Sequence, residues 1–448
     1  MTWWSVLCCV LWCAGHAKWV TVATNYIHSW PLKRRVLKSL RLFFDVVMVM
    51  GWLHSLAPIL WVGGSPPGFS YDSQAGNTVG AYGWSWTAQI FWWGWGLSGL
   101  SLLAISAYRH QTKDRVPVLA ETRQDREDFR QTVPVMTLCS GGYAPLLRLR
   151  ANEQLTLCRS YRRLHLVSWP DVWQGFKLLH ISDLHLRGGV TRAYFARVFE
   201  QMARLDADIV VFTGDLLDHP ACLSWVESLF SSIRAPLGCY FILGNHDWYL
   251  PVCQDARLAL SSAGWIDVSE RPVEIQFPQE LGIKTHDVES WGQHFPDGNW
   301  RESSYWSCTK MRGVEWGRRG ELSMLASPAP AIYLVGTEYP WMGKLPEIGP
   351  RQADQPRILL SHTPDVFPWA VAHEFDLVLA GHTHGGQICL PLLGPIYSPS
   401  RFSCRYAGGV YHRARTVMHV SRGVSGRMPV RWGCPPEITL IELRRADQ

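Results

Sequence analysis

Residues 177–186 read KLLHISDLHL, an apolar run that leads into an aspartate and a histidine two residues apart, Asp183 and His185. An apolar run of this kind is typical of a strand buried on both faces of a parallel sheet. Open α/β sheets bind their ligands just beyond the carboxyl ends of such strands. Asp183 and His185 therefore have the position and the chemistry of metal ligands at a sheet edge.

Four further apolar runs end in polar residues that bind metals. IVVFTG leads to Asp215, CYFILG to Asn245, His246 and Asp247, RILLS to His362, and DLVLA to His382 and His384. A lone Asp or His at a strand end is more often a solvated loop residue. Five such ends in one chain instead favour an active site at one edge of a sheet.

The residue types suit two divalent metal ions. Two such ions about 3.5–4 Å apart can hold a phosphoryl group and provide the nucleophile that attacks phosphorus. Asp215 is the candidate for a bridging carboxylate, whose charge would offset the repulsion between the ions. Imidazole suits iron and zinc, and carboxylates also suit magnesium and manganese. We expect manganese first, with iron, zinc or magnesium as alternatives.

His246 has a different expected task from the metal ligands. It is a candidate hydrogen-bond donor that stabilises charge on the phosphate or protonates the leaving oxygen. Its neighbour Asp247 is expected to orient the imidazole ring. Both are therefore predicted catalytic residues.

These motifs, taken in order, resemble the pattern DxH, GD, GNH[DE], H and GHxH of the calcineurin-like metallophosphoesterase superfamily, over roughly residues 172–444. The resemblance implies an α/β fold, a two-sheet αββα sandwich. It also implies two ligand sets that share Asp215: one of Asp183, His185, Asp215 and His384, and one of Asp215, Asn245, His362 and His382.

Two later stretches resemble the membrane-associated branch of that superfamily: GHTHGGQICLP from residue 381 and the ending that begins at Val420. That branch includes enzymes that cleave the pyrophosphate of UDP-2,3-diacylglucosamine to UMP and a lipid monophosphate in lipid A synthesis. The resemblance makes this hydrolysis the expected activity. A broad phosphodiesterase or phosphomonoesterase acting on another membrane-associated or nucleotide substrate is the alternative.

Arg187 departs from the family's pattern, because a glycine usually follows DLHL. An arginine beside a metal site is able to bind a substrate phosphate, or it simply points to water. Both interpretations stay open.

The first quarter of the 448-residue chain differs from the rest. It holds half of the 24 Trp residues, and Asp45 and Asp72 are the charged residues of 42–107. Residues 42–62 and 84–107 have the length and composition of transmembrane helices. A third span over residues 3–24 stays open because His16 and Lys18 interrupt it. We therefore expect a membrane anchor over 1–110, a connecting region over 111–171 and a catalytic domain over 172–448.

Basic residues flank both expected spans, whereas residues 63–82 hold no Lys or Arg. The positive-inside rule then predicts a helical hairpin at the inner (cytoplasmic) membrane, with the catalytic domain facing the cytoplasm. The expected partners are the lipid bilayer and a lipid-linked or nucleotide-containing phosphate substrate. No interleaved basic and aromatic groove accompanies the motifs, so nucleic acid is not an expected partner.

Three further features leave alternatives. The basic run Arg148–Arg163 is either a solvated strand face or a contact for anionic lipid headgroups. Residues 272–330 are rich in Trp, Gly and charge, and they form either a cap over the metals or a peripheral insertion. A membrane scaffold with a decayed phosphoesterase domain is a second class of function, but the intact set of ligands argues against it.

Overall fold

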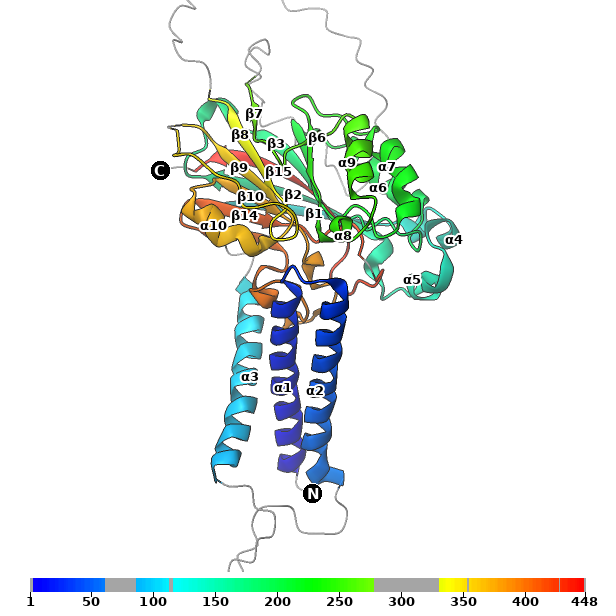
Figure 1. Ribbon diagram of the computed structural model, residues 1–448, viewed down its shortest axis with the longest axis vertical. Coiled ribbons are helices and arrows are strands. Elements are labelled where there is room, and N and C mark those ends of the chain that lie inside the picture. Colours follow the sequence, from blue (N-terminus) through cyan, green and yellow to red (C-terminus); the bar gives the residue numbers. More distant parts are fainter. Residues whose placement is uncertain are drawn as a thin grey trace, which may run out of the picture.

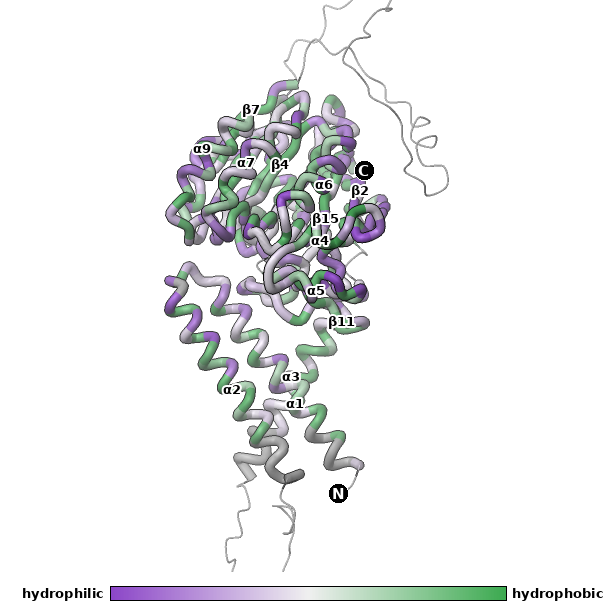
Figure 2. The backbone as a smooth tube through the Cα atoms, turned by 90° about the vertical axis from the view of Figure 1, so that its right-hand side faces the viewer, coloured by the Kyte–Doolittle hydropathy of each residue, from purple (hydrophilic) through white to green (hydrophobic). Residues whose placement is uncertain are grey.

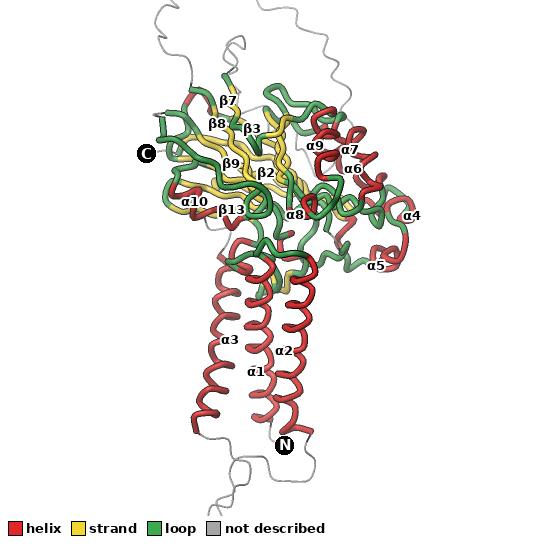
Figure 3. The backbone as a smooth tube through the Cα atoms, in the orientation of Figure 1, coloured by secondary structure: helices red, strands yellow, loops and turns green. Residues whose placement is uncertain are grey.

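The computed structural model describes residues 3–60, 86–112, 116–277, 330–352, 354–426 and 428–446. Three N-terminal helices lie side by side beneath a domain built on two β-sheets (Figure 1). Figure 3 shows that the helices of this domain gather at its sides, with the strands between them.

The larger sheet has seven strands in the order β1-β2-β15-β3-β4-β5-β6. Strands β3 to β6 run parallel to one another, and β15 lies antiparallel to β3 and parallel to β2. The bounds are β1 (Leu119–Asp128), β2 (Thr156–Leu166), β15 (Glu437–Arg445), β3 (Phe176–Ile181), β4 (Ile209–Thr213), β5 (Cys239–Ile242) and β6 (Ile266–Asp267).

The second sheet has six strands in the order β13-β14-β10-β9-β8-β7. Its four central strands are parallel, and its two edge strands are antiparallel to their neighbours. The bounds are β13 (Gly409–Arg413), β14 (Thr416–Val420), β10 (Leu377–Ala380), β9 (Arg357–Ser361), β8 (Ile332–Thr337) and β7 (Val273–Ile275). A short antiparallel pair, β11 (Cys389–Leu390) and β12 (Gly394–Pro395), stands apart.

Side chains alternate between two cores along each central strand. In β4, Val211 packs between the two sheets, whereas Phe212 packs against the outer helices. Helices α6 (Arg192–Ala203), α7 (Leu223–Phe230) and α9 (Cys253–Ser262) cover the larger sheet, and α10 (Phe367–Ala372) covers the smaller one (Figure 1). The expected two-sheet α/β sandwich is therefore confirmed. Among the described residues, the remaining short α-helices are α4 (Val135–Leu138), α5 (Ala144–Arg148) and α8 (Asn245–Trp248).

Residues 119–166, assigned from the sequence to a connecting region, instead supply two strands of the larger sheet. The local sequence is polar because its basic residues pair with acidic residues on neighbouring strands. Arg162 Nη2 lies 3.4 Å from Glu437 Oε1, and Arg163 Nη1 lies 2.8 Å from Glu121 Oε2. This part of the basic run is thus a paired strand face, and its partner strand β15 comes from the far end of the chain.

The three N-terminal helices are α1 (Trp3–His28), α2 (Arg34–Leu60) and α3 (Trp86–Thr112), and we call them the helical stalk. The predicted spans fall in these helices, apart from residues 61–62 and 84–85, which lie outside the described residues. Hydrophilic and hydrophobic residues are interspersed along the stalk (Figure 2). Among the described residues, no helix combines the length and apolarity needed to cross a membrane.

Close backbone packing and hydrogen bonds hold α1 to α3. A Cβ added to Gly99 would lie 2.2 Å from the carbonyl oxygen of Gly15, so only a glycine permits this approach. Trp19 Nε1 donates to Ser98 Oγ over 3.0 Å.

The stalk is also bound to the sandwich. The Asn25 side chain is fully buried, donates to Ser403 Oγ over 2.9 Å, and accepts from the Ser398 amide over 3.1 Å. After α1, the carbonyl of Leu32 accepts from Tyr249 Oη over 3.2 Å. Two separate segments of the catalytic domain therefore fix the position of α1.

The loop between the two predicted spans and most of the predicted cap lie outside the described residues. The expected loop 63–82 lies outside the described residues, as do residues 278–329 of the insertion. Strand β7 forms from the beginning of that insertion and pairs with β8. The cap remains a prediction.

Candidate metal centre

The polar residues that follow β3, β4, β5, β9 and β10 all lie at one edge of the sandwich. The backbone there is strained. Five of these residues have a positive φ, which favours glycine: Asp183 (55°), His185 (47°), Asp215 (58°), His382 (71°) and His384 (51°). Left-handed residues other than glycine cost about 1–3 kcal/mol each and gather at functional sites.

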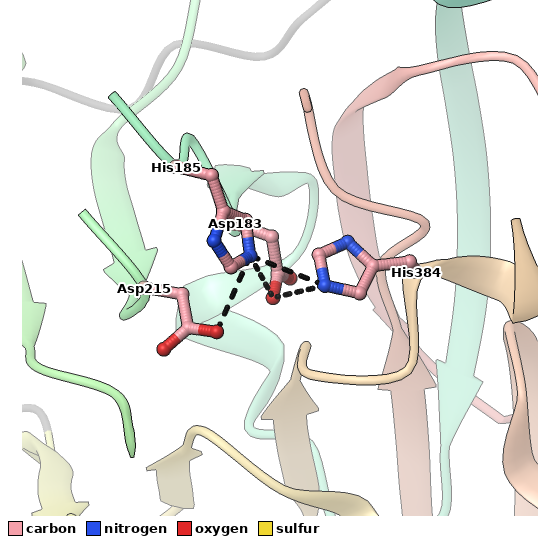
Figure 4. A group of neighbouring side chains, drawn as sticks. All are labelled: Asp183, His185, Asp215 and His384. Carbon is pink, nitrogen blue, oxygen red and sulfur yellow. Dashed lines mark hydrogen bonds and ion pairs between the residues drawn. The ribbon is translucent and has the colours of Figure 1, made fainter. Parts of the chain in front are cut away.

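Four side chains form a first cluster, drawn in Figure 4: Asp183, His185, Asp215 and His384. His185 Nε2 lies 3.3 Å from Asp215 Oδ2 and 3.1 Å from His384 Nε2. Asp183 Oδ1 lies 3.7 Å from His384 Nε2. Two carboxylates and two imidazoles thus converge on one point.

A second cluster lies on the other side of Asp215. Its Oδ1 is 3.3 Å from His362 Nε2, and His362 Nε2 is 3.1 Å from both Asn245 Oδ1 and His382 Nδ1. The two oxygens of Asp215 therefore face different clusters. This is the arrangement that a bridging carboxylate requires.

Asp215 Oδ2, a buried atom that faces the first cluster, has no hydrogen-bond partner among the described residues. Leaving a buried polar atom unpaired is unfavourable, and such atoms are rare in folded proteins. Imidazole nitrogens together with carboxylate and amide oxygens are the donors that borderline divalent metals take. The residues present therefore fit a pair of metal ions.

Hydrogen bonds to backbone carbonyls fix the orientation of two of the histidine rings. His362 Nδ1 lies 2.8 Å from the carbonyl oxygen of Thr213, and His384 Nδ1 lies 3.1 Å from that of Ser425. A ring nitrogen that donates to a backbone carbonyl leaves the other nitrogen to face the site. His362 and His384 thus present Nε2 as the ligand atom, whereas His382 turns Nδ1 toward His362.

The charges in the site are strongly coupled. Although burial opposes ionisation, His362, His246 and His185 hold the pKa of Asp215 well below its usual range. Burial acts to lower the pKa of His185, yet Asp218 and Asp215 raise it to about 9. In the same way, Asp215 overcomes burial and raises the pKa of His362 to about 9. Burial, together with the neighbouring His362 and His185, instead holds the pKa of His382 and of His384 well below the ordinary value, so these two rings are neutral.

Glycines in the GNH and GHTH motifs allow close approach to the carboxylates. A Cβ on Gly244 would lie 2.2 Å from Asp215 Oδ1. A Cβ on Gly381 would lie 1.9 Å from Ser182 Oγ and 2.5 Å from Asp183 Oδ2. Any larger residue at either position would displace a candidate ligand.

The residue that contacts His246 is Asp218, which was not predicted from the sequence. Asp218 Oδ1 contacts His246 Nδ1 and lies 3.3 Å from His185 Nδ1. The His246 ring is 23% exposed, whereas Asp218 is 6% exposed. The only signal in the sequence is its spacing, three residues after Asp215 in GDLLD.

Asp247 makes different contacts from those expected. Its carboxylate accepts from the backbone amides of Leu216 (3.1 Å), Leu217 (2.8 Å) and Gly244 (2.9 Å). Consecutive residues of a helix do not face each other, so Asp247 does not reach the ring of His246. It joins the loops after β4 and β5.

Arg187 is exposed, with its guanidinium carbon 5.5 Å from the centroid of the Tyr143 ring. This is a cation–π distance. Its predicted contact with substrate remains a prediction.

The profile of the calcineurin-like phosphoesterase family matches residues 176–386. Phosphodiesterase YaeI of Escherichia coli is 34% identical over 63% of this chain and 87% of its own length. The chain belongs to the calcineurin-like phosphoesterases. It is therefore a metal-dependent phosphoester hydrolase.

Two further relatives share less sequence identity with this chain. UDP-2,3-diacylglucosamine pyrophosphatase LpxG of Chlamydia muridarum is 26% identical over 60% of this chain and 83% of its own length. A transmembrane protein with a metallophosphoesterase domain from Bos taurus is 28% identical over 62% of this chain and 55% of its own length.

Proposed function

We propose that this phosphoesterase cleaves the pyrophosphate of a lipid-linked nucleotide, with UDP-2,3-diacylglucosamine as the first candidate and UMP and a lipid monophosphate as products. One observation carries the proposal. The end of the stalk helix α1 lines a cavity that reaches the residue next to a candidate metal ligand.

In this proposal, one ion is held by Asp183, His185, Asp215 and His384, and the other by Asp215, Asn245, His362 and His382. Two bound metals supply positive charge for the phosphate oxygens and lower the pKa of the attacking water. Manganese is the first candidate, with iron, zinc or magnesium as alternatives.

His246 supplies the proton in this reaction. Asp218 engages its Nδ1, so Nε2 is the atom left to donate to a phosphate oxygen or to the leaving oxygen. Although burial opposes it, His185 and His246 hold the pKa of Asp218 well below its usual range, so Asp218 stays ionised. The Asp218 carboxylate thereby fixes the orientation of the His246 ring.

The cavity beside the metal centre has a volume of about 200 Å³ and includes Tyr26 of α1, Trp30 of the turn after α1, Tyr339, and Thr363, which follows His362. Trp341 lies close by, with its ring centroid 4.8 Å from that of His382. Aromatic walls suit the apolar part of an amphipathic substrate. A substrate held along the stalk would therefore bring its phosphates to the metals.

The stalk also exposes large apolar side chains, among them Leu42 (65%), Phe43 (59%), Met50 (60%) and Leu97 (60%). Apolar surface of this kind marks contact with a membrane or another protein. Together with the basic residues that flank the helices, it supports our proposal that the stalk associates with the inner membrane and that the catalytic domain faces the cytoplasm.

The first test is hydrolysis of UDP-2,3-diacylglucosamine by the full chain, purified in detergent with added manganese. We expect UMP, identified by product mass, from the natural sequence and from an Arg204→Gln control on the exposed end of α6. The Asp215→Asn variant should release none. Absence of UMP from the natural sequence would exclude this substrate.

Broad phosphodiesterase activity is the second candidate, favoured by the 34% identity to a relative named as a phosphodiesterase. Hydrolysis of bis(p-nitrophenyl) phosphate without release of UMP would favour it over the pyrophosphatase. Hydrolysis of p-nitrophenyl phosphate in the same series measures any phosphomonoesterase activity.

A further inference from the structure

A second and larger cavity lies between the stalk and the catalytic domain. It has a volume of about 650 Å³ and is lined by α1, α3, the segment 401–408 and β13. The hydrogen bonds of Asn25 to Ser398 and Ser403 fix α1 beside it. Packing between two well-held parts of the chain therefore creates this space.

The lining carries positive charge. Among the described residues, it includes six Lys or Arg side chains and no Asp or Glu. The six are Lys18, Arg109, Arg401, Arg405, Arg413 and Arg422. An excess of one sign in a concave site concentrates the field and attracts ions of the opposite sign.

Two of these cations form ion pairs among the described residues. Arg422 Nε lies 3.0 Å from Glu437 Oε2, and Arg401 Nε lies 3.9 Å from Asp365 Oδ2. Within the described part of the chain, no carboxylate lies within ion-pair distance of Lys18, Arg109 or Arg413. The basic residues on β2 are paired, so this is not a general property of the chain.

Lys18 is buried without an ion-pair partner. The residue is only 7% exposed, yet its ammonium group makes no ion pair in the described structure. Burial of an unpaired ammonium group is strongly unfavourable. A bound anion in the cavity would remove this cost.

Apolar residues also line the cavity on the stalk side. Val22, Leu102 and Ile105 lie there, facing a domain wall that includes Leu393 and Phe402. The ligand that matches both parts has an anionic head and an apolar chain. We propose that this cavity binds the phosphate headgroup of an anionic phospholipid, with the phosphate against Lys18 and the arginines and an acyl chain against the stalk.

This site is separate from the metal centre, but it adjoins the loop that holds one candidate metal ligand in place. Gly385, which directly follows His384, lines the cavity together with Cys434. Cys434 Sγ donates to the carbonyl oxygen of His384 over 3.3 Å. A bound lipid would therefore contact the loop that carries His384, a candidate metal ligand. None of the candidate metal ligands lines the cavity itself.

Native mass spectrometry of the full chain in neutral detergent tests this inference. The chain is equilibrated with phosphatidylcholine micelles, with or without phosphatidylglycerol. We expect selective retention of phosphatidylglycerol, and a weakening by about fivefold for each cation neutralised in Lys18→Gln and Arg413→Gln. The Arg204→Gln variant, which removes an exposed cation far from the cavity, should retain the lipid.

Three results would overturn the inference. The first is equal retention by the Lys18→Gln, Arg413→Gln double variant, with Arg413→Gln alone as the measure if the double variant does not fold. The second is displacement of the lipid by glycerol phosphate at the lipid's own concentration, which would mean a site for a free phosphate. The third is loss of the lipid in Asp215→Asn, which would put the lipid at the metal centre. Lipid retention by Asp215→Asn supports the site whatever the substrate of the metal centre.

Discussion

The carboxylate of Asp218 contacts Nδ1 of His246, and the same oxygen lies 3.3 Å from Nδ1 of His185. One buried acid therefore orients both the partly exposed His246 and a candidate metal ligand. This double contact explains why a residue outside the recognised motifs matters to the site. It also makes Asp218 a positioning residue whose role can be separated from that of His246.

Asp218→Asn should lower turnover by about 10–100-fold, because His246 loses the carboxylate that orients its ring toward the leaving group. The loss should be larger for a substrate with a poor leaving group than for bis(p-nitrophenyl) phosphate, which departs without a proton. Rates with both substrates measure this difference. An equal loss with both would mean that Asp218 acts only through His185.

His246→Ala should leave the metal content nearly intact and lower turnover by about 10²–10⁴-fold. Asp215→Asn should instead lose metal, because its two oxygens face both clusters. Metal analysis by mass spectrometry beside rate measurements separates the two effects. A fully active His246→Ala would remove the proposed proton donor, and unchanged metal in Asp215→Asn would remove the bridge.

Asp247→Ala should destabilise the fold, because three buried backbone amides lose their acceptor. At about 1–3 kcal/mol for each unpaired group, the free energy of unfolding should fall by at least about 3 kcal/mol. Thermal or urea unfolding measures it. Asp206→Ala is the matched control, because its side chain is 87% exposed and its single ion pair spans 3.7 Å. Full stability with lost turnover would return Asp247 to a catalytic role.

Metal binding should release protons. In the absence of metal, Asp218 and Asp215 overcome burial to raise the pKa of His185 to about 9, and Asp215 does so for His362. Both rings are then protonated at neutral pH, whereas a metal needs them neutral. Affinity should therefore increase as pH rises from about 7 toward 9, with up to about two protons released. Calorimetry in buffers of different ionisation enthalpy counts them, and no proton release would contradict these pKa values.

Gly244→Ala should lower metal content, because the added methyl group would press on Asp215 Oδ1 from 2.2 Å. Gly142→Ala is the control, since nothing lies within 4 Å of its added Cβ. Metal analysis and circular dichroism of both variants check that the ligand moves while the fold remains. Normal metal content in Gly244→Ala would show that Asp215 has room to shift.

Much of the sandwich could be predicted from the sequence, because each central strand is a local apolar run followed by its own polar residues. The structure brings Asp183, Asp215 and His362 together as their strand ends indicated. The strands β1 and β2 could not be predicted this way, because polar residues of β1 pair with β2, and polar residues of β2 also pair with β15 at the far end of the chain. The pairing of Asp218 with His246 depends on how two loops cross, which no local pattern encodes.

Asn25 joins the stalk to the catalytic domain. Its two hydrogen bonds, at 2.9 and 3.1 Å, join a fully buried side chain of α1 to the catalytic domain. The stalk is thus rigidly attached to the catalytic domain and does not act as a flexible tether. The position and orientation of the metal centre are therefore fixed relative to the axis of α1. The length of α1 then sets how far the metal centre lies from the other end of the stalk.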